Sequence, residues 1–91
     1  MFPVEFTPKQ GQYLAFIYAY TTINDYAPAV TDLQRFFGVS GATAHNMVVR
    51  LADLGLLARI PGAARSIEIL IPPESLPVLR RPKENTSWAA R

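Results

Sequence analysis

Three stretches of the chain carry apolar residues at the spacing of an α-helix. In the first stretch, the apolar residues that share one helical face are Tyr13, Leu14, Ile17 and Tyr20, flanked by Phe16. Thr7 can accept hydrogen bonds from the free N–H groups of a first helical turn, and Pro8 fits the first helical position. The pattern therefore predicts a helix from Pro8 to about Thr22.

Two further helices are predicted on either side of a short turn. The second has helical spacing at Val30, Leu33, Phe36 and Phe37. Gly38 can adopt the left-handed conformation that ends a helix, so the second helix should stop there.

The third helix should begin after Ser40, a favourable N-cap, and stop at Gly55. Its apolar face consists of Ala44, Val48, Leu51 and Leu54. The polar residues off that face are Thr43, His45, Asn46 and Arg50. We therefore expect the apolar face to pack inward and the polar face to meet solvent.

After Gly55 the apolar pattern changes from helical to alternating. Residues 57–60 and 66–71 read as two strands around a Pro-Gly turn at residues 61–65. Two strands alone are marginal in water, so this hairpin must rest on the helices. The predicted fold is α+β and mainly helical: a winged helix-turn-helix, with three helices and then a β-hairpin wing. Residues 1–72 form this domain, and residues 73–91 are expected to be a polar, flexible tail.

Composition limits the chemistry that the chain can carry. The 91 residues include no cysteine and one histidine, so a disulfide framework or a zinc cluster is not expected. Neither a signal peptide nor a stretch of about 20 apolar residues is present, and we expect a cytoplasmic protein outside the membrane. No paired carboxylates, nucleophile setting or glycine-rich phosphate loop appears. We expect no enzymatic activity, no cofactor, no metal and no small-molecule ligand.

The net charge of +2 gives little general attraction to nucleic acids. Within residues 1–72 the basic residues are Lys9, Arg35, Arg50, Arg59 and Arg65. They are matched in number by Glu5, Asp25, Asp32, Asp53 and Glu68. Binding to DNA would therefore depend on where the charges lie. Arg35 can also pair with Asp32, three residues earlier on the same helix.

Three blocks of the sequence resemble the N-terminal DNA-binding domain of bacterial LexA-type SOS repressors. They are FTPKQGQYLAFI, APAVTDLQRFFGVS and LADLGLLARIPGAARSIEIL, and the resemblance covers roughly residues 6–71. It implies a winged helix-turn-helix that binds double-stranded DNA. LexA repressors continue into a self-cleaving domain, whereas this chain stops before one, so we do not expect autoproteolysis.

The resemblance and the geometry of a helix-turn-helix predict which residues contact DNA. The residues expected nearest the bases are Ser40, Ala42, Thr43, His45 and Asn46. Asn46 has the side chain that reads adenine with two hydrogen bonds. The residues expected at the DNA backbone are Arg50, Arg59, Arg65 at the wing tip, and Lys9. The alternative for each of these residues is an ordinary solvent-exposed position that makes no contact with DNA.

The first helix has no charged residue between Gln10 and Asn24. A solvated helix normally presents charge on its outer face, and uncovered apolar area often marks a contact. We therefore predict a homodimer interface at Phe2, Val4, Ala15, Tyr18, Ala19 and Thr22.

Two functions remain open at this point. The favoured one is a sequence-specific DNA-binding regulator that represses transcription by occupying an operator. The alternative is a winged-helix module that binds another protein and not DNA. A positive strip joining Arg50, Arg59 and Arg65 would favour DNA, whereas scattered charge would favour a protein partner.

Overall fold

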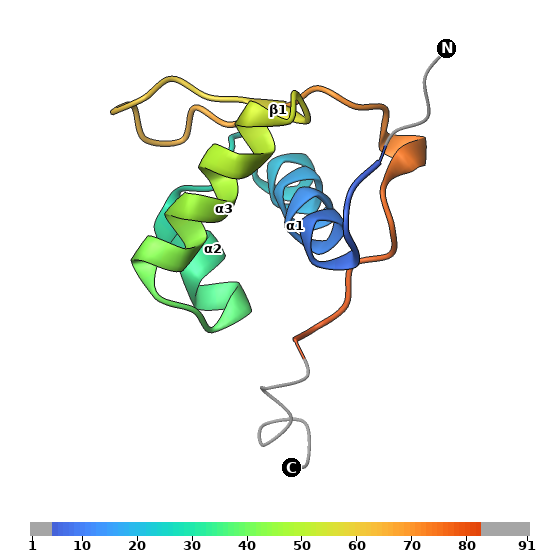
Figure 1. Cartoon of the computed structure of the whole chain (residues 1–91), viewed down its shortest axis with the longest axis horizontal. Coiled ribbons are helices and arrows are strands. Elements are labelled where there is room, and N and C mark those ends of the chain that lie inside the picture. Colours follow the sequence, from blue (N-terminus) through green and yellow to red (C-terminus); the bar gives the residue numbers. More distant parts are fainter. Residues whose placement is uncertain (1–4, 83–91) are drawn as a thin grey trace.

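The computed structural model describes residues 5–82 and contains three helices, a two-stranded sheet and a final 3-10 turn (Figure 1). In chain order these are α1 (Pro8–Asn24), α2 (Val30–Phe37), α3 (Gly41–Asp53), β1 (Leu57–Ala58), β2 (Glu68–Ile69) and η1 (Pro73–Ser75). Helices followed by an antiparallel hairpin confirm the predicted winged helix-turn-helix.

The start of α1 is fixed by the cap that the sequence predicts. The backbone N–H of Gln10 donates to Thr7 Oγ1 (3.1 Å), and the backbone N–H of Thr7 donates to Gln10 Oε1 (2.9 Å). This reciprocal pair is a capping box. The helix continues past the predicted Thr22 to Asn24, because Asp25 takes the left-handed conformation (φ 64°) that ends it.

The turn between α2 and α3 also follows the local signals. Gly38 is left-handed (φ 66°) and its N–H donates to the Gln34 carbonyl (3.0 Å), so α2 ends where predicted. Ser40 Oγ accepts from the backbone N–H of Thr43 (3.1 Å) and caps α3. The end of α2 and the start of α3 therefore define the short turn between the two helices of the helix-turn-helix motif.

One hydrophobic core joins the three helices and β1. Its buried residues are Tyr13, Leu14, Ile17, Leu33, Phe37, Ala44, Val48, Leu51, Leu56 and Leu57. The rings of Tyr13 and Phe37 stack with centroids 4.0 Å apart, which joins α1 to the end of α2.

The prediction that Leu54 belongs to the inward face of α3 is wrong. Its side chain is 45% exposed. Helix α3 ends at Asp53, and Leu54 lies on the turn that follows, where the helical spacing no longer applies. Leu56 is buried after that turn and contributes to the core in its place.

The hairpin is shorter than the alternating pattern predicted. Leu57 pairs with Ile69 and Ala58 with Glu68, so the strands occupy only part of residues 57–60 and 66–71. Beyond these pairs, Ser66 Oγ accepts from the Ile60 N–H (2.9 Å) and donates to the Ile60 carbonyl (3.2 Å). A side chain therefore replaces the backbone ladder at this point, and the strands separate.

Residues 73–82 differ from the expected flexible tail. Leu76 packs against the core, and Gln12 on α1 holds the segment at two points. Gln12 Nε2 donates to the Val78 carbonyl (2.9 Å), and the Arg80 N–H donates to Gln12 Oε1 (2.8 Å). Leu76 and the two hydrogen bonds of Gln12 together provide this docking. The rest of the predicted tail, residues 83–91, lies outside the described residues.

A glycine in the first turn of α1 lies close to the segment at residues 73–82. Gly11 is buried, and a Cβ at this position would lie 3.0 Å from Pro77 Cγ and 2.7 Å from Phe6 Cε1. Both approaches are too close for a real Cβ atom to fit without a shift. We infer that Gly11 gives the flanking segments room to lie on the helix.

Candidate DNA-binding surface

Helix α3 presents a polar, solvent-facing side along its N-terminal half. The exposed residues there are Ser40, Ala42, Thr43, His45 and Asn46, which are the residues predicted nearest the bases. The opposite side holds Ala44, Val48 and Leu51 in the core. Figure 1 shows α3 on the outside of the helical cluster, with α2 behind it. The structure thus brings the predicted base-contact residues together on one accessible ridge.

Ser40 has a second role on that ridge. Its hydroxyl accepts from the Thr43 N–H and also donates to Thr43 Oγ1 (3.0 Å). The Ser40 hydroxyl is therefore engaged in capping, whereas the Ala42, His45 and Asn46 side chains face solvent. Those three are the better-placed groups for contact with an outside molecule.

A groove of about 350 Å³ separates α3 from the wing, which we define as residues 59–67. Its lining combines the start of α2, the middle of α3 and the wing, and includes Val30, His45, Val48, Arg59, Ile60 and Ile67. The floor of this groove is mostly apolar. Arg59 of the wing and His45 of α3 both line this groove.

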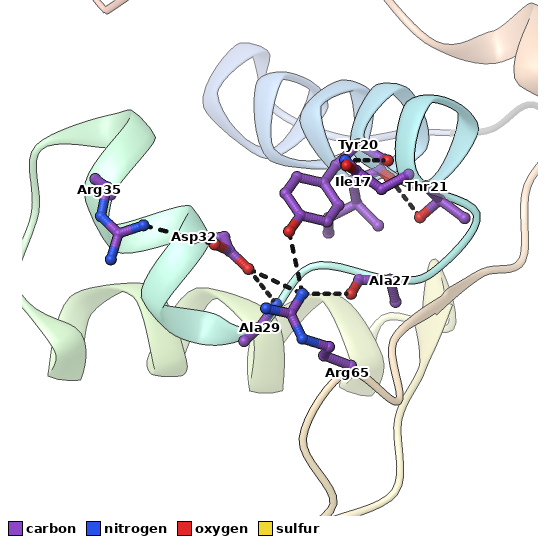
Figure 2. Close-up of polar contacts among 9 residues, drawn as sticks. Ile17, Tyr20, Thr21, Ala27, Ala29, Asp32, Arg35 and Arg65 are labelled. Carbon is purple, nitrogen blue, oxygen red and sulfur yellow. Dashed lines mark hydrogen bonds and ion pairs between the residues drawn. The ribbon is translucent and has the colours of Figure 1, made fainter.

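Arg65 is turned back toward the helices. Its Nη1 donates hydrogen bonds to Tyr20 Oη (3.1 Å), the Ala27 carbonyl (3.2 Å) and Asp32 Oδ2 (3.2 Å). Figure 2 shows the guanidinium between α1, the loop after it and the start of α2. Its Cζ also lies 4.9 Å from the centroid of the Tyr26 ring. The hydrogen bond to Tyr20 is the main cause that raises the pKa of Arg65 above its ordinary value; desolvation opposes the rise, and the charges of Tyr20 and Asp32 add to it.

Asp32 links three groups at the start of α2. Its Oδ2 accepts from the backbone N–H of Ala29 (2.8 Å) as well as from Arg65. Its Oδ1 lies 3.9 Å from Arg35 Nη1, which confirms the pairing expected from their spacing. Since the Arg35 side chain is 80% exposed, that ion pair adds little stability. Sequence spacing gave no signal for the pair between Asp32 and Arg65, which lie 33 residues apart.

The other predicted backbone contacts fall in two places. Arg50 is exposed on α3, and Arg59 lines the groove between α3 and the wing. Lys9 instead lines a separate groove with Phe37 and residues 80–82. The structure therefore groups Arg50 and Arg59 with the α3 ridge but does not bring Lys9 to that groove.

The predicted dimer surface is partly covered by the chain itself. Ala15 is 5% exposed and lies beside Leu76 and Pro77, so the docked C-terminal segment makes it unavailable to a partner. This corrects the expectation for Ala15. Tyr18 (41%) and Thr22 are exposed, and Ala19 is half-buried. Phe2 and Val4 lie outside the described residues.

The described part of the chain shows neither a membrane-spanning helix nor a metal-binding cluster. Over residues 5–82, no helix is long and apolar enough to cross a bilayer. In the same range, no group of three or more potential His, Cys, Asp or Glu ligands gathers at one point.

The element order, the tight α2–α3 turn and the wing beside α3 define a winged helix-turn-helix protein. The family model "LexA DNA binding domain" matches residues 4–66, and the chain belongs to that family.

Similar proteins include two named LexA repressor. The one from Thermosipho africanus is 32% identical over 74 residues, which cover 81% of this chain and 37% of the relative. The one from Moorella thermoacetica is 32% identical over 84 residues, which cover 91% of this chain and 40% of the relative. The chain therefore spans well under half the length of these relatives.

Proposed function

We propose that the protein binds double-stranded DNA at specific sequences and represses transcription in the cytoplasm by occupying an operator. The observation that carries the proposal is the exposed polar ridge at the N-terminal half of α3, on a domain of the LexA DNA-binding family. In a helix-turn-helix this part of the second motif helix enters the major groove. The family match also favours DNA binding over the alternative of a protein-interaction module. The role needs no catalytic step.

Base recognition would come from short side chains on α3. Asn46 can form two hydrogen bonds with adenine, and the methyl groups of Ala42 and Thr43 can contact thymine methyls. His45 lies at the edge of the groove, where it can donate to a base or to a phosphate. A ridge of such small groups allows the helix to lie deep in the major groove.

Phosphate contacts would come from Arg50 on α3 and Arg59 on the wing. If each neutralises one phosphate, the logarithm of affinity falls with the logarithm of salt concentration with a slope of about −1.8. A fourfold rise in salt would then weaken binding roughly twelvefold. Lys9, on its separate groove, would add to this slope only if the DNA extends past α3 toward the start of α1.

A homodimer would present two copies of α3 to a palindromic site. The described surface that supports it is the exposed part of α1 at Tyr18 and Thr22, with Ala19 between them. Sedimentation of the wild type and of Tyr18→Glu tests this arrangement. A wild type that stays monomeric at tens of micromolar contradicts it, and a dimer that Tyr18→Glu dissociates supports it.

Selection from random duplex DNA, followed by titration at two salt concentrations, tests the DNA-binding proposal. We expect an enriched motif, palindromic if the protein acts as a dimer, and an affinity that falls as salt rises. Failure to enrich any motif, with the same weak binding to all duplexes, would contradict sequence-specific recognition.

A further inference from the structure

The tip of the wing has little backbone support of its own. The strand pairs end at Ala58 and Glu68. Beyond the Ser66 side-chain bridge, the turn is closed by a hydrogen bond from the Ala63 N–H to the Ile60 carbonyl (3.0 Å). Gly62 lies in open space with φ 80°. A tip of this kind needs another contact to hold a fixed position beside α3.

Arg65 supplies such a contact to three parts of the helical body. It reaches Tyr20 on α1, the Ala27 carbonyl in the loop, and Asp32 on α2. Its backbone is left-handed (φ 56°), a conformation that residues other than glycine adopt infrequently. We call Arg65, Tyr20, Ala27 and Asp32 the wing anchor.

The charge of Arg65 is offset within the anchor. Asp32 Oδ2 lies 3.2 Å from its Nη1, and the Asp32 side chain is only 14% exposed. In contrast, over residues 5–82 neither Arg50 nor Arg59 forms a salt bridge. A guanidinium already paired with a carboxylate contributes less to phosphate attraction than an unpaired one.

We propose that Arg65 is a positioning residue, which fastens the wing to the helices and sets the width of the groove between wing and α3, and that it is not a phosphate contact. The part of this proposal that concerns DNA rests on the function proposed above. All three hydrogen bonds are donated by Nη1 at the far end of the side chain, and the flat guanidinium lies near the Tyr26 ring. A lysine ammonium has the charge, but its side chain ends earlier and has no flat face to lie against the ring.

The two possible roles of Arg65 predict opposite effects of removing the Asp32 charge. Asp32→Asn keeps an oxygen that can accept from both the Ala29 N–H and Arg65, so the α2 cap is retained and the variant removes only the negative charge that pairs with Arg65. If Arg65 contacts phosphate, this variant frees its charge and DNA affinity stays equal or rises. If Arg65 holds the wing, the variant loosens the wing and DNA affinity falls.

The first test measures the wing without DNA. Backbone ¹⁵N relaxation and amide exchange of residues 62–65 should report increased mobility in Arg65→Lys and Asp32→Asn, with a smaller increase in Tyr20→Phe. Arg35→Lys is the matched control, because Arg35 also pairs with Asp32 but lies outside the anchor. Unchanged wing mobility in Arg65→Lys and Asp32→Asn would overturn the proposal.

The second test measures affinity for the selected duplex at two salt concentrations. We expect Arg65→Lys and Asp32→Asn each to weaken binding roughly fivefold, as for a wing that is correctly placed about one fifth of the time, with the salt slope unchanged. Arg35→Lys, the control used in the first test, should bind as the wild type. Two results together would show a phosphate contact and overturn the proposal. Arg65→Lys would bind with wild-type affinity, and the slope of log affinity against log salt concentration would be smaller by about 0.9 in Arg65→Gln.

The two tests separate failure of the anchor from failure of the proposed function. If the wild type selects no DNA, the proposed function is contradicted, but the relaxation measurements still decide whether Arg65 holds the wing. If the wild type binds its selected duplex and the wing is equally rigid in every variant, the anchor is contradicted and the DNA-binding proposal stands.

Discussion

Truncation of Leu76 to alanine should destabilise the domain, although the sequence pattern places this residue in a tail. Leu76 packs against the core and is half-buried. Full burial of a leucine side chain is worth about 1.5–3 kcal/mol, so a half-buried one that loses most of its carbons should cost about 1–2 kcal/mol. For a domain of this size, that corresponds to a fall in melting temperature of roughly 4–15 °C.

Val78→Ala is the matched control for Leu76→Ala. Val78 belongs to the same segment, but its side chain is 73% exposed. Its truncation should change stability by less than about 0.5 kcal/mol. The assay is thermal unfolding of both variants followed by circular dichroism. Equal melting temperatures for Leu76→Ala, Val78→Ala and the wild type would refute the docking of residues 73–82.

Three other substitutions test the fold and the α3 ridge. Ser40→Ala removes the cap of α3 and should cost about 0.5–2 kcal/mol in thermal unfolding; no loss would contradict the capping role. Leu33→Ala opens a cavity at a fully buried position and should cost about 2–5 kcal/mol in urea unfolding; a cost below 1 kcal/mol would contradict the packing of α2. Asn46→Ala should reduce discrimination at one adenine position by about 1–3 kcal/mol in competition binding; unchanged discrimination would remove Asn46 from base reading.

The starts of α1 and α3 and the end of α2 could be predicted because their signals are local. Thr7 and Ser40 accept hydrogen bonds from residues three positions later, and Gly38 ends α2 through its own backbone conformation. The exposed face of α3 followed from its spacing for the same reason. Leu54 shows the limit of this reasoning. Helical spacing placed it on the inward face of α3, but the spacing does not show that the helix ends one residue earlier, at Asp53.

The partners of Arg65 and Gln12 could not be predicted in this way. Arg65 lies 45 residues from Tyr20 and 33 from Asp32, and Gln12 lies 66 residues from Val78. Contacts of this range depend on the packed arrangement of whole elements, which spacing along the chain does not encode. The proline-rich, polar composition of residues 73–82 predicted a tail. Composition alone does not show that α1 has space at Gly11 for this segment to pack.

The most direct test of DNA reading by α3 is a titration of the ¹⁵N-labelled 91-residue chain with its selected duplex, followed by amide chemical shifts. We predict that the largest shift changes fall on residues 40–46, with a second group on the wing at residues 59–65. Changes concentrated on α1, with residues 40–46 unaffected at saturation, would contradict the account.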